Sequence, residues 1–505
     1  MIIGSIFHNL WAMLTFSGDS PLMISSGLFP WIFLLMIAGS AMTRRNNVAR
    51  VAWLLLCSYY CYYKTTGGAM MWLIVVTVSD WLLARGIDRT GNETWRRMMV
   101  ATSVILDLSL LAFFKYAGFI ASIVGSSFVG FDVLMPVGIS FYIFQSIGYT
   151  VDVYRGKVEA TDSLLEYAFF LAFFPQLVMG PIVRAGDMLP QLRERARVTR
   201  TMLGVGVWLV MCGLFKKAVL ADFIGANFVN RIFADPTHSP GIVNLLGVYG
   251  YAFKLYLDFS GYSEMAIGLS MLLGLKIAPN FNSPYRSASI TEFWRRWHIS
   301  LSTWLRDYLY ISLGGNRKGT LRQNINLFIT MTLGGLWHGA SWNFVIWGAL
   351  HGAALIVHKW WMRFTGQDPR NPRRHSWAGH ILAVAVTFHF VCFTWVFFNT
   401  GSVGGYTDDA GFYHAGALDM LSNIFCHFAP EHFGAYMSQF AGIYRQPLAL
   451  LALAVVLHYV PENVEQRCRE TFAAMPIWTY AVALAVVVTL ITQLDIALPF
   501  DYITF

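Results

Sequence analysis

The residue best placed to do chemistry is His338, in the segment GGLWHGASWN at positions 334–343. It stands inside an apolar run, about 14 residues beyond Asn324, and a helix of that length rises roughly 20 Å. An ionisable side chain at such a depth in a membrane is costly and marks a functional site by default. Because a histidine can act as a general base near neutral pH, we predict that His338 is catalytic. The alternative is a core histidine that is hydrogen-bonded to a neighbouring helix.

A second histidine stands among arginines in the segment 291–312, which reads TEFWRRWHISLSTWLRDYLYIS. In a continuous helix, Arg295 and His298 fall at i and i+3 on one face, which Arg306 extends by further turns. Guanidinium groups bind phosphates well, so this face suits a ligand such as the coenzyme A tail. We predict that Arg295, Arg306 and Trp297 contact this donor. The alternative is an interfacial helix whose arginines meet lipid headgroups.

Polar side chains also stand inside other apolar runs. Asp258 and Glu264 lie within residues 241–275, and carboxylates buried in a membrane need cations or a polar network. We expect the arginines of segment 291–312 to supply those cations. The predicted pocket is lined by Trp337, Asn343, Asp258, Ser260 and His351.

The composition indicates the elements that must position these residues. Hydrophobic residues make up 56% of the 505 residues and charged residues only 13%, whereas soluble proteins average about 25% charged residues. A membrane span needs about 20 apolar residues, so the sequence predicts an all-α polytopic integral membrane protein. The net charge of +8 stands in short clusters between apolar runs, for example at 44–50, 85–97 and 193–200. This pattern is typical of cytoplasmic loops, and no basic soluble domain remains to bind nucleic acid.

One apolar run conflicts with this topology. The run 164–180 should lead outward, yet the basic cluster 193–200 that follows it is again of the cytoplasmic kind. Pro175, Gly180 and Pro181 break a helix here, and broken backbone at membrane depth needs protein or a cavity around it. We therefore predict a re-entrant segment that lines a pocket; the alternative is a kinked span.

Two further segments stand outside the predicted spans. Residues 276–324 are too charged to cross and too aromatic for a free loop, so we predict an amphipathic helix in the interface. Ser289 and Glu292 have capping-box spacing and would start it, and Gly314-Gly315 would end it. Residues 400–446 are predicted to form the largest outer loop, rich in Gly, Asp and His. The six cysteines show no metal-ligand repeat, so no metal is expected; the alternative is a site at Cys426, His427 and His432. No tightly bound cofactor is expected either.

Five segments carry a resemblance to a known family. They are PVGISFYIFQSIGYTVDVYRG (136–156), FFPQLVMGPIVR (173–184), YLDFSGYSEMAIGL (256–269), ITEFWRRWHISLSTWLRDYLYISLGGNR (290–317) and LGGLWHGASWNFVIWGALHG (333–352). Together they resemble the membrane-bound O-acyltransferase family, and more closely its bacterial branch that acts in alginate and exopolysaccharide O-acetylation. The resemblance covers most of residues 100–360.

The resemblance implies a fold, a site and partners. It implies a ring of about 11 to 13 tilted, interfacial and re-entrant helices around a central funnel. It implies catalytic roles for His338 and His298. It also implies that an acetyl group enters from cytoplasmic acetyl-CoA, which is a substrate and not a cofactor. On the outer side an exported periplasmic or membrane-anchored acetyltransferase, part of a polysaccharide biosynthesis complex, would pass it to alginate or cellulose.

The whole chain, residues 1–505, is therefore predicted to be one membrane-bound O-acyltransferase domain of the bacterial inner membrane. Residues 1–95 would be peripheral helices, 96–360 the catalytic core, and 361–505 the C-terminal helices with the outer loop 400–446. Within the family, D-alanyl transfer and peptidoglycan acyl transfer are alternatives with the same mechanism. A transporter would show inverted repeats, which the sequence lacks, and a scaffold would show no acyl transfer.

Overall fold

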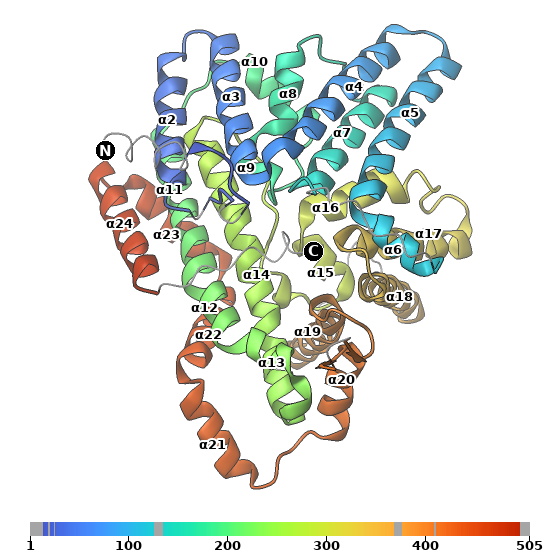
Figure 1. Ribbon diagram of the computed structural model, residues 1–505, viewed down its shortest axis with the longest axis vertical. Coiled ribbons are helices and arrows are strands. Elements are labelled where there is room, and N and C mark those ends of the chain that lie inside the picture. Colours follow the sequence, from blue (N-terminus) through green and yellow to red (C-terminus); the bar gives the residue numbers. More distant parts are fainter. Residues whose placement is uncertain are drawn as a thin grey trace. The chain divides into compact units, whose positions relative to one another are not determined.

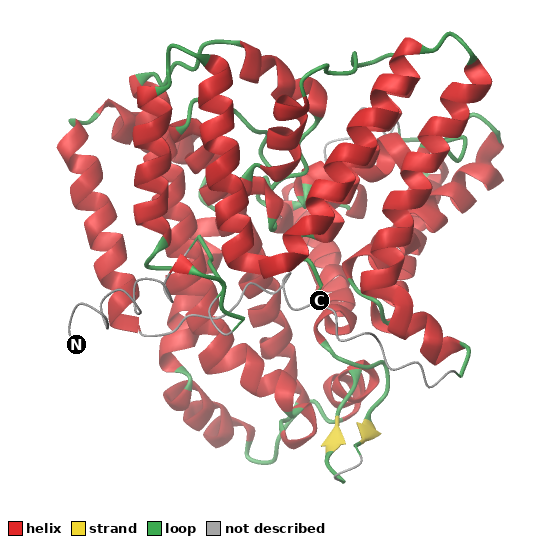
Figure 2. Cartoon of the chain, turned by 45° about the horizontal axis from the view of Figure 1, so that its top comes forward, coloured by secondary structure: helices red, strands yellow, loops and turns green. Residues whose placement is uncertain are grey.

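The computed structural model describes residues 14–18, 21–24, 26–125, 135–367, 376–408 and 411–494. Within these ranges the chain is almost entirely helical, and the only strands form one small hairpin (Figure 2). Contacts divide the chain into two compact units. Unit 1 comprises residues 1–210, 264–278 and 472–480, and unit 2 comprises residues 211–263, 279–471 and 481–505.

Unit 1 is built mainly from the first ten labelled helices (Figure 1). These are α2 (Phe29–Met42), α3 (Asn47–Thr66), α4 (Met70–Arg89), α5 (Glu93–Leu111), α6 (Ala117–Ile123), α7 (Ile139–Tyr154), α8 (Leu164–Ala172), α9 (Phe174–Leu177), α10 (Ala185–Arg193) and the start of α11 (Arg200–Leu214). The turns that join α2 to α3 and α4 to α5 lie at the same end of this unit (Figure 1). The basic clusters at 44–50 and 85–97 lie at or beside these turns, so the two clusters that the sequence places on one side of a membrane share one end of the unit.

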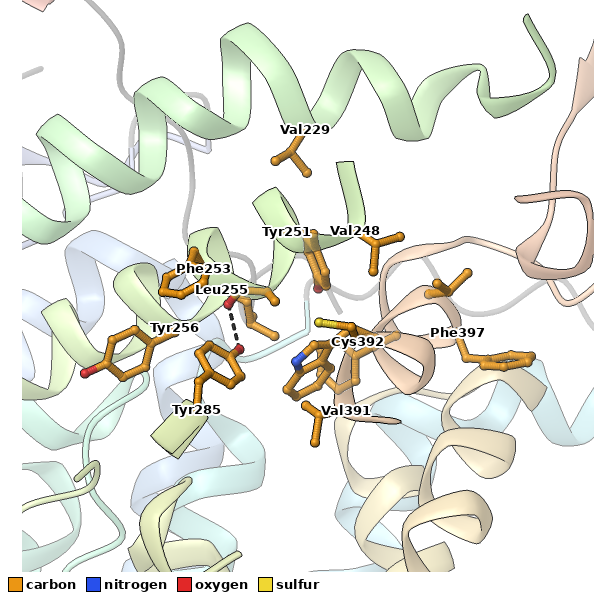
Figure 3. Close-up of a cluster of buried hydrophobic side chains, with 14 of the residues drawn as sticks. Val229, Val248, Tyr251, Phe253, Leu255, Tyr256, Tyr285, Val391, Cys392 and Phe397 are labelled. Carbon is orange, nitrogen blue, oxygen red and sulfur yellow. Dashed lines mark hydrogen bonds between the residues drawn. The ribbon is translucent and has the colours of Figure 1, made fainter. Parts of the chain in front are cut away.

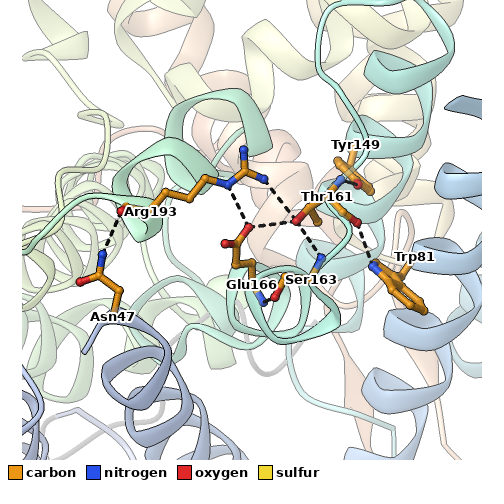
Figure 4. Close-up of polar contacts among 7 residues, drawn as sticks. All are labelled: Asn47, Trp81, Tyr149, Thr161, Ser163, Glu166 and Arg193. Atoms are coloured by element: carbon orange, nitrogen blue, oxygen red, sulfur yellow. Dashed lines mark hydrogen bonds and ion pairs between the residues drawn. The ribbon is translucent and has the colours of Figure 1, made fainter.

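The segment predicted to be re-entrant is broken and returns on itself. Helix α8 has nine residues, too few for a span of about 20, and the extended backbone of Phe173 ends it before the one-turn α9. At the far end of α10, the Arg193 guanidinium lies 3.1 Å from the Glu166 carboxylate and donates to Thr161 Oγ1 (Figure 4). Both ends of this stretch therefore meet at one place. The predicted break is confirmed, whereas re-entry into the membrane and the lining of a pocket stay predictions.

Unit 2 contains the predicted site. Its helices are α12 (Asp222–Ile224), α13 (Asn230–Ala234), α14 (Gly241–Leu272), α15 (Ile290–Arg296), α16 (Ile299–Trp304), α17 (Gly319–His338), α18 (Trp342–Phe364), α19 (Trp377–Asn399), α20 (Ala417–Cys426), α21 (Phe433–Ile443), α22 (Arg445–His458), α23 (Glu462–Ala474) and α24 (Ile477–Leu494). Helices α11, α14, α23 and α24 contribute residues to both units. Three π-helical turns interrupt the pattern at Phe215–Ala221, Gly225–Val229 and Leu305–Tyr310.

The core of unit 2 is rich in aromatic side chains from α14, α15 and α19. Figure 3 shows part of it, with Tyr251, Phe253 and Tyr256 of α14 near Tyr285 and Cys392. Tyr285 is 2% exposed, and its hydroxyl donates to the Ala252 carbonyl at 2.7 Å. The aromatic surface buried here stabilises the frame that carries the polar site residues.

Four helical stretches of the described chain are long and apolar enough to cross a membrane, or up to six if each of two bent helix pairs is one span. The four are Asn47–Arg89, Glu93–Ile123, Arg200–Ala234 and Trp377–Asn399. The chain is thus an all-α multi-pass membrane protein. The ring of helices, its funnel and the single-domain division stay predictions.

The prediction of an outer loop over 400–446 is wrong in its detail. This stretch contains the hairpin of β1 (Tyr406–Thr407) and β2 (Tyr413–His414), followed by α20 and α21. Helix α20 buries Ala417, Met420 and Ile424, which lie on one face at i, i+3 and i+7. The abundance of Gly, Asp and His in the segment concealed this short amphipathic pattern.

Candidate active site

His338 is the last residue of α17, and the chain turns at Gly339 to enter α18. The two helices approach closely at paired glycines. A Cβ on Gly335 would lie 2.2 Å from the Phe344 carbonyl oxygen, and one on Gly348 would lie 2.4 Å from that of Met331. Both neighbours are backbone atoms that cannot turn aside, so only glycine permits this crossing. The glycine contacts thereby fix the position of His338 along the axis of α18.

The His338 ring lies in an aromatic box. Its centroid is 4.9 Å from that of Trp337, 5.2 Å from that of Trp347 and 5.2 Å from that of Phe398. The residue is only 3% exposed. An imidazole in such surroundings is shielded from bulk water, and charges that develop beside it interact strongly. Trp347 and Phe398 were not predicted, because they come from α18 and α19 and only the fold brings them here.

The continuous helix predicted over 291–312 is wrong. Helix α15 ends at Arg296, His298 has left-handed backbone (φ 43°), and α16 begins at Ile299. Ser289 does start α15, because its hydroxyl accepts from the Glu292 amide. At the other end of the segment, the positive-φ residues Gly314 and Gly315 follow the π-helical turn Leu305–Tyr310. Both predicted ends are therefore confirmed. The shared face is lost, because residues before and after the break follow different helix axes.

The break turns His298 inward and leaves Arg295 outside. His298 is fully buried, whereas Arg295 is exposed. The His298 ring lies 4.7 Å from Phe259 and 6.2 Å from Trp337, measured between centroids. Burial lowers the pKa of His298 to about 3, so this imidazole is neutral at physiological pH.

Trp337 connects the two predicted catalytic histidines, since its ring contacts both His298 and His338. The fold therefore gathers them into one site from two segments about 40 residues apart. Their common neighbour is a flat apolar wall, which suits an uncharged acyl group better than a charged one.

His351 is buried beside the site, with both ring nitrogens occupied. Trp294 Nε1 donates to His351 Nδ1 at 3.3 Å, so Nε2 carries the hydrogen and donates to Thr394 Oγ1 at 3.0 Å. Its ring packs 4.7 Å from Trp347. These bonds assign His351 to the wall behind Trp347 and leave it no nitrogen for a substrate.

Asp258 does not pair with the arginines of segment 291–312, as predicted, but with Lys217. The Lys217 ammonium lies 2.8 Å from Asp258 and 2.8 Å from Asp222, and each of the three side chains is at most 4% exposed. Lys217 stands in the π-helical turn Phe215–Ala221. A lysine inside an apolar run was the signal that the sequence offered, and π-helical turns are frequent at functional sites.

The other predicted pocket residues are buried. Asn343 at the start of α18 donates to the Thr400 hydroxyl at 3.1 Å, which ties α18 to the end of α19. Ser260 and Trp297 are each 1% exposed, and Trp297 packs 5.1 Å from Trp395. Trp297 is thus part of the aromatic core and presents little surface to a donor.

Arg295 lines a basic cavity of about 1010 Å³, at the upper end of the usual range of about 300–1,000 Å³ for ligand pockets. It is formed by α15, the start of α17, the last turns of α18 and the start of α19. Its charged and imidazole side chains are Arg295, Arg296, Lys359, Arg363, His358, His380 and one carboxylate, Glu292.

Arg306 lines a different and more apolar cavity of about 190 Å³, together with Trp294, Leu305 and Lys359. Its guanidinium pairs with Asp307 at 2.7 Å, and this contact raises the pKa of Arg306. Lys359 lines both cavities. The structure thus separates the two arginines that the sequence placed on one helical face.

This helical membrane protein has two buried histidines that contact one tryptophan, and it has a separate basic cavity. These are parts that an intramembrane transferase needs. A histidine can take the proton of an attacking hydroxyl, and a cationic cavity can hold the phosphates of a carrier. Comparison with known proteins agrees. Residues 159–400 match the model of the membrane-bound O-acyltransferase family.

Three relatives show the range of the match. A probable alginate O-acetylase of Azotobacter vinelandii is 43% identical over 353 residues, which cover 67% of this chain and 69% of the relative. A peptidoglycan O-acetyltransferase of Helicobacter pylori is 36% identical, covering 70% and 72%. A teichoic acid D-alanyltransferase of Bacillus subtilis is 31% identical, covering 52% and 68%. The chain belongs to the membrane-bound O-acyltransferase family and is an O-acyltransferase.

Proposed function

We propose that this protein takes an acetyl group from cytoplasmic acetyl-CoA and passes it across the bacterial inner membrane, where it O-acetylates a polysaccharide such as alginate or cellulose. The observation that supports this most is the contact of Trp337 with both buried histidines. The names of the relatives support an acyl group delivered to a cell-surface polymer.

In the proposed reaction, a hydroxyl oxygen attacks the thioester carbonyl carbon and its proton passes to His338. The C–S bond then breaks, the acetyl group stays on the hydroxyl oxygen, and His338 returns its proton to the sulfur, so that coenzyme A leaves as the free thiol. His298, neutral because of its burial, assists as a hydrogen-bond acceptor. The aromatic box excludes water, which protects the thioester from hydrolysis.

The basic cavity is the proposed site of the donor's phosphates. Arg295 and Arg363 are exposed at its rim, and the Arg363 guanidinium donates to Gln323 Oε1 at 3.1 Å. Lys359 lies deeper and reaches toward the apolar cavity of Arg306. A donor held at this place would have its charged end at the rim and its thioester pointing along α18.

We predict that Arg295→Glu weakens acetyl-CoA binding roughly ten- to hundred-fold, because a charged hydrogen bond is worth about 1.5–3 kcal/mol. Binding can be measured by titration calorimetry on the purified protein in detergent. Arg317→Glu, which reverses an exposed arginine outside the cavity, is the control. Arg306→Glu tests the second predicted donor contact.

If Arg295→Glu binds acetyl-CoA with unchanged affinity, Arg295 does not contact the donor, and the interpretation that it meets lipid headgroups remains. Binding of a carrier-protein thioester in place of acetyl-CoA would favour D-alanyl transfer, which the teichoic acid relative suggests. Peptidoglycan as acceptor would follow the Helicobacter relative. A wild-type protein that transfers nothing from any thioester would be a transporter or a scaffold.

The hairpin and helices of residues 400–446 are the proposed docking surface for the exported acetyltransferase. Tyr406, Phe412, Tyr413, Phe428 and Phe433 are all exposed there, and aromatic side chains are enriched at protein interfaces. The alternative is a structural cap over the helices. Deleting the segment would also remove the buried face of α20, so point variants give the cleaner test.

We predict that Phe412→Ser combined with Phe428→Ser lowers polymer acetylation in cells several-fold, because truncating exposed aromatic anchors weakens an interface. Slow acetyl-CoA hydrolysis by the purified variant should stay at the wild-type rate, since neither residue contacts His338. If hydrolysis and polymer acetylation fall together, the surface belongs to the fold and the docking proposal fails.

A further inference from the structure

The side chain of Asn280 joins the two pieces of the broken helix. It is 1% exposed and lies in the segment between α14 and α15. Its Oδ1 accepts from the Ser300 amide at 3.1 Å and from the Ser300 hydroxyl at 2.9 Å, and it lies 3.2 Å from His298 Nδ1. On the other side, Nδ2 donates to Ser263 Oγ of α14 at 3.3 Å.

Asn280 also supplies the cap that α16 lacks. The first amides of a helix have no partner within it, and the side chain of His298, at the N-cap, makes no capping bond. Asn280 satisfies two of these amides, Ile299 through its backbone carbonyl at 2.9 Å and Ser300 through its side chain. The left-handed backbone of His298 is therefore held from outside its own helix.

The same contacts determine the tautomer of His298. A backbone amide can only donate, so the Asn280 atom that faces the Ser300 amide is the oxygen. An amide oxygen can only accept, so its 3.2 Å contact with His298 Nδ1 requires a hydrogen on that nitrogen. The Ser300 hydroxyl also lies 3.5 Å from Nδ1, but it donates to the nearer Asn280 Oδ1 at 2.9 Å. The lone pair of the neutral ring is then on Nε2.

We infer that Asn280 is a positioning residue for acyl transfer, which holds His298 in the Nδ1–H tautomer with Nε2 as its acceptor nitrogen. This inference rests on the proposed function only where acyl-transfer activity is used to test it. Among the rings that contact His298 are those of Phe259, Phe281 and Trp337, which carry no charge. Burial lowers the pKa of this histidine to about 3, which keeps the tautomer neutral throughout the physiological range.

The first test is Asn280→Asp, which keeps the shape of the side chain and the three contacts of its Oδ1. A carboxylate beside Nδ1 favours the imidazolium, so it raises the pKa of His298 by about one to three units. Activity that needs the neutral ring is lost when the ring gains a proton. The acidic limb of the pH–activity profile should therefore lie about one to three pH units higher in the variant than in the wild type. Ser263→Ala removes only the Nδ2 contact and should keep the wild-type pH profile. A wild-type profile in Asn280→Asp would overturn the inference.

The second test measures the wild-type protein itself and uses a variant only to assign the signal. ¹⁵N NMR of histidine-labelled wild-type protein distinguishes the two tautomers, and comparison with His298→Gln identifies the signal among the 13 histidines. The expected signal is that of a neutral ring protonated at Nδ1. A ring protonated at Nε2 would overturn the inference. Both results hold even if acetyl-CoA is not the donor, so they are distinguishable from a failure of the proposed function.

Discussion

Replacing His338 with alanine is expected to lower acyl transfer by about two to four orders of magnitude, the usual contribution of a general base. The residue ends α17, is 3% exposed and is enclosed by Trp337, Trp347 and Phe398. His351, which is also buried on α18, has both ring nitrogens hydrogen-bonded within the protein. Transfer of radiolabelled acetyl groups by purified protein in nanodiscs measures the loss.

The variant should still insert and fold, because α17 and α18 are held together by the glycine contact at Gly335 and Gly348 and not by His338. A thermal midpoint within a few degrees of the wild type would show this. His389→Ala is the matched control, since His389 lies on α19 of the same unit and is exposed. Wild-type transfer by His338→Ala would refute the catalytic role.

The local features of this fold could be predicted from the sequence because they depend on neighbouring residues. Ser289 and Glu292 cap α15 through contacts three residues apart, and the run 164–180 is broken where it carries a proline and a glycine. The burial of His338 was predicted from its position deep in an apolar run, whereas its catalytic role stays a prediction. Each of these signals lies within one segment and needs no knowledge of the tertiary fold.

The break at His298 could not be predicted in the same way. The spacing of Arg295, His298 and Arg306 fits a continuous helix, and no glycine or proline marks the left-handed residue. What stabilises it is Asn280, which stands 18 positions earlier. The helical period therefore predicted that Arg295, His298 and Arg306 share one face of a helix. A contact with a residue distant in sequence breaks that helix at His298.

The partner of Asp258 was missed for a related reason. A buried carboxylate needs a cation, and the sequence offered several arginines in the segment 291–312. The fold instead brings Lys217 to it from the π-helical turn Phe215–Ala221. Charge balance predicts that a cation is present, but the topology decides which one it is.

Lys217→Met is expected to destabilise the protein by about 3–5 kcal/mol, the cost of removing one partner of a buried ion pair. The ammonium lies 2.8 Å from both Asp222 and Asp258, and the three side chains are at most 4% exposed. Methionine keeps the length of the side chain but removes the charge that offsets two carboxylates. Denaturant or thermal unfolding in detergent measures the loss.

The double variant Lys217→Met with Asp258→Asn separates charge from packing. It removes one of the two carboxylates that Lys217 contacts, and asparagine keeps the shape of the side chain. If the loss comes from uncompensated charge, the double variant should be more stable than Lys217→Met alone. Two independently destabilising substitutions would instead add their losses of unfolding free energy and give a less stable protein. Lys318→Met, at an exposed lysine, should unfold like the wild type. A Lys217→Met protein as stable as the wild type would mean that the ion pair contributes nothing to the fold, and that Asp258 tolerates burial for another reason.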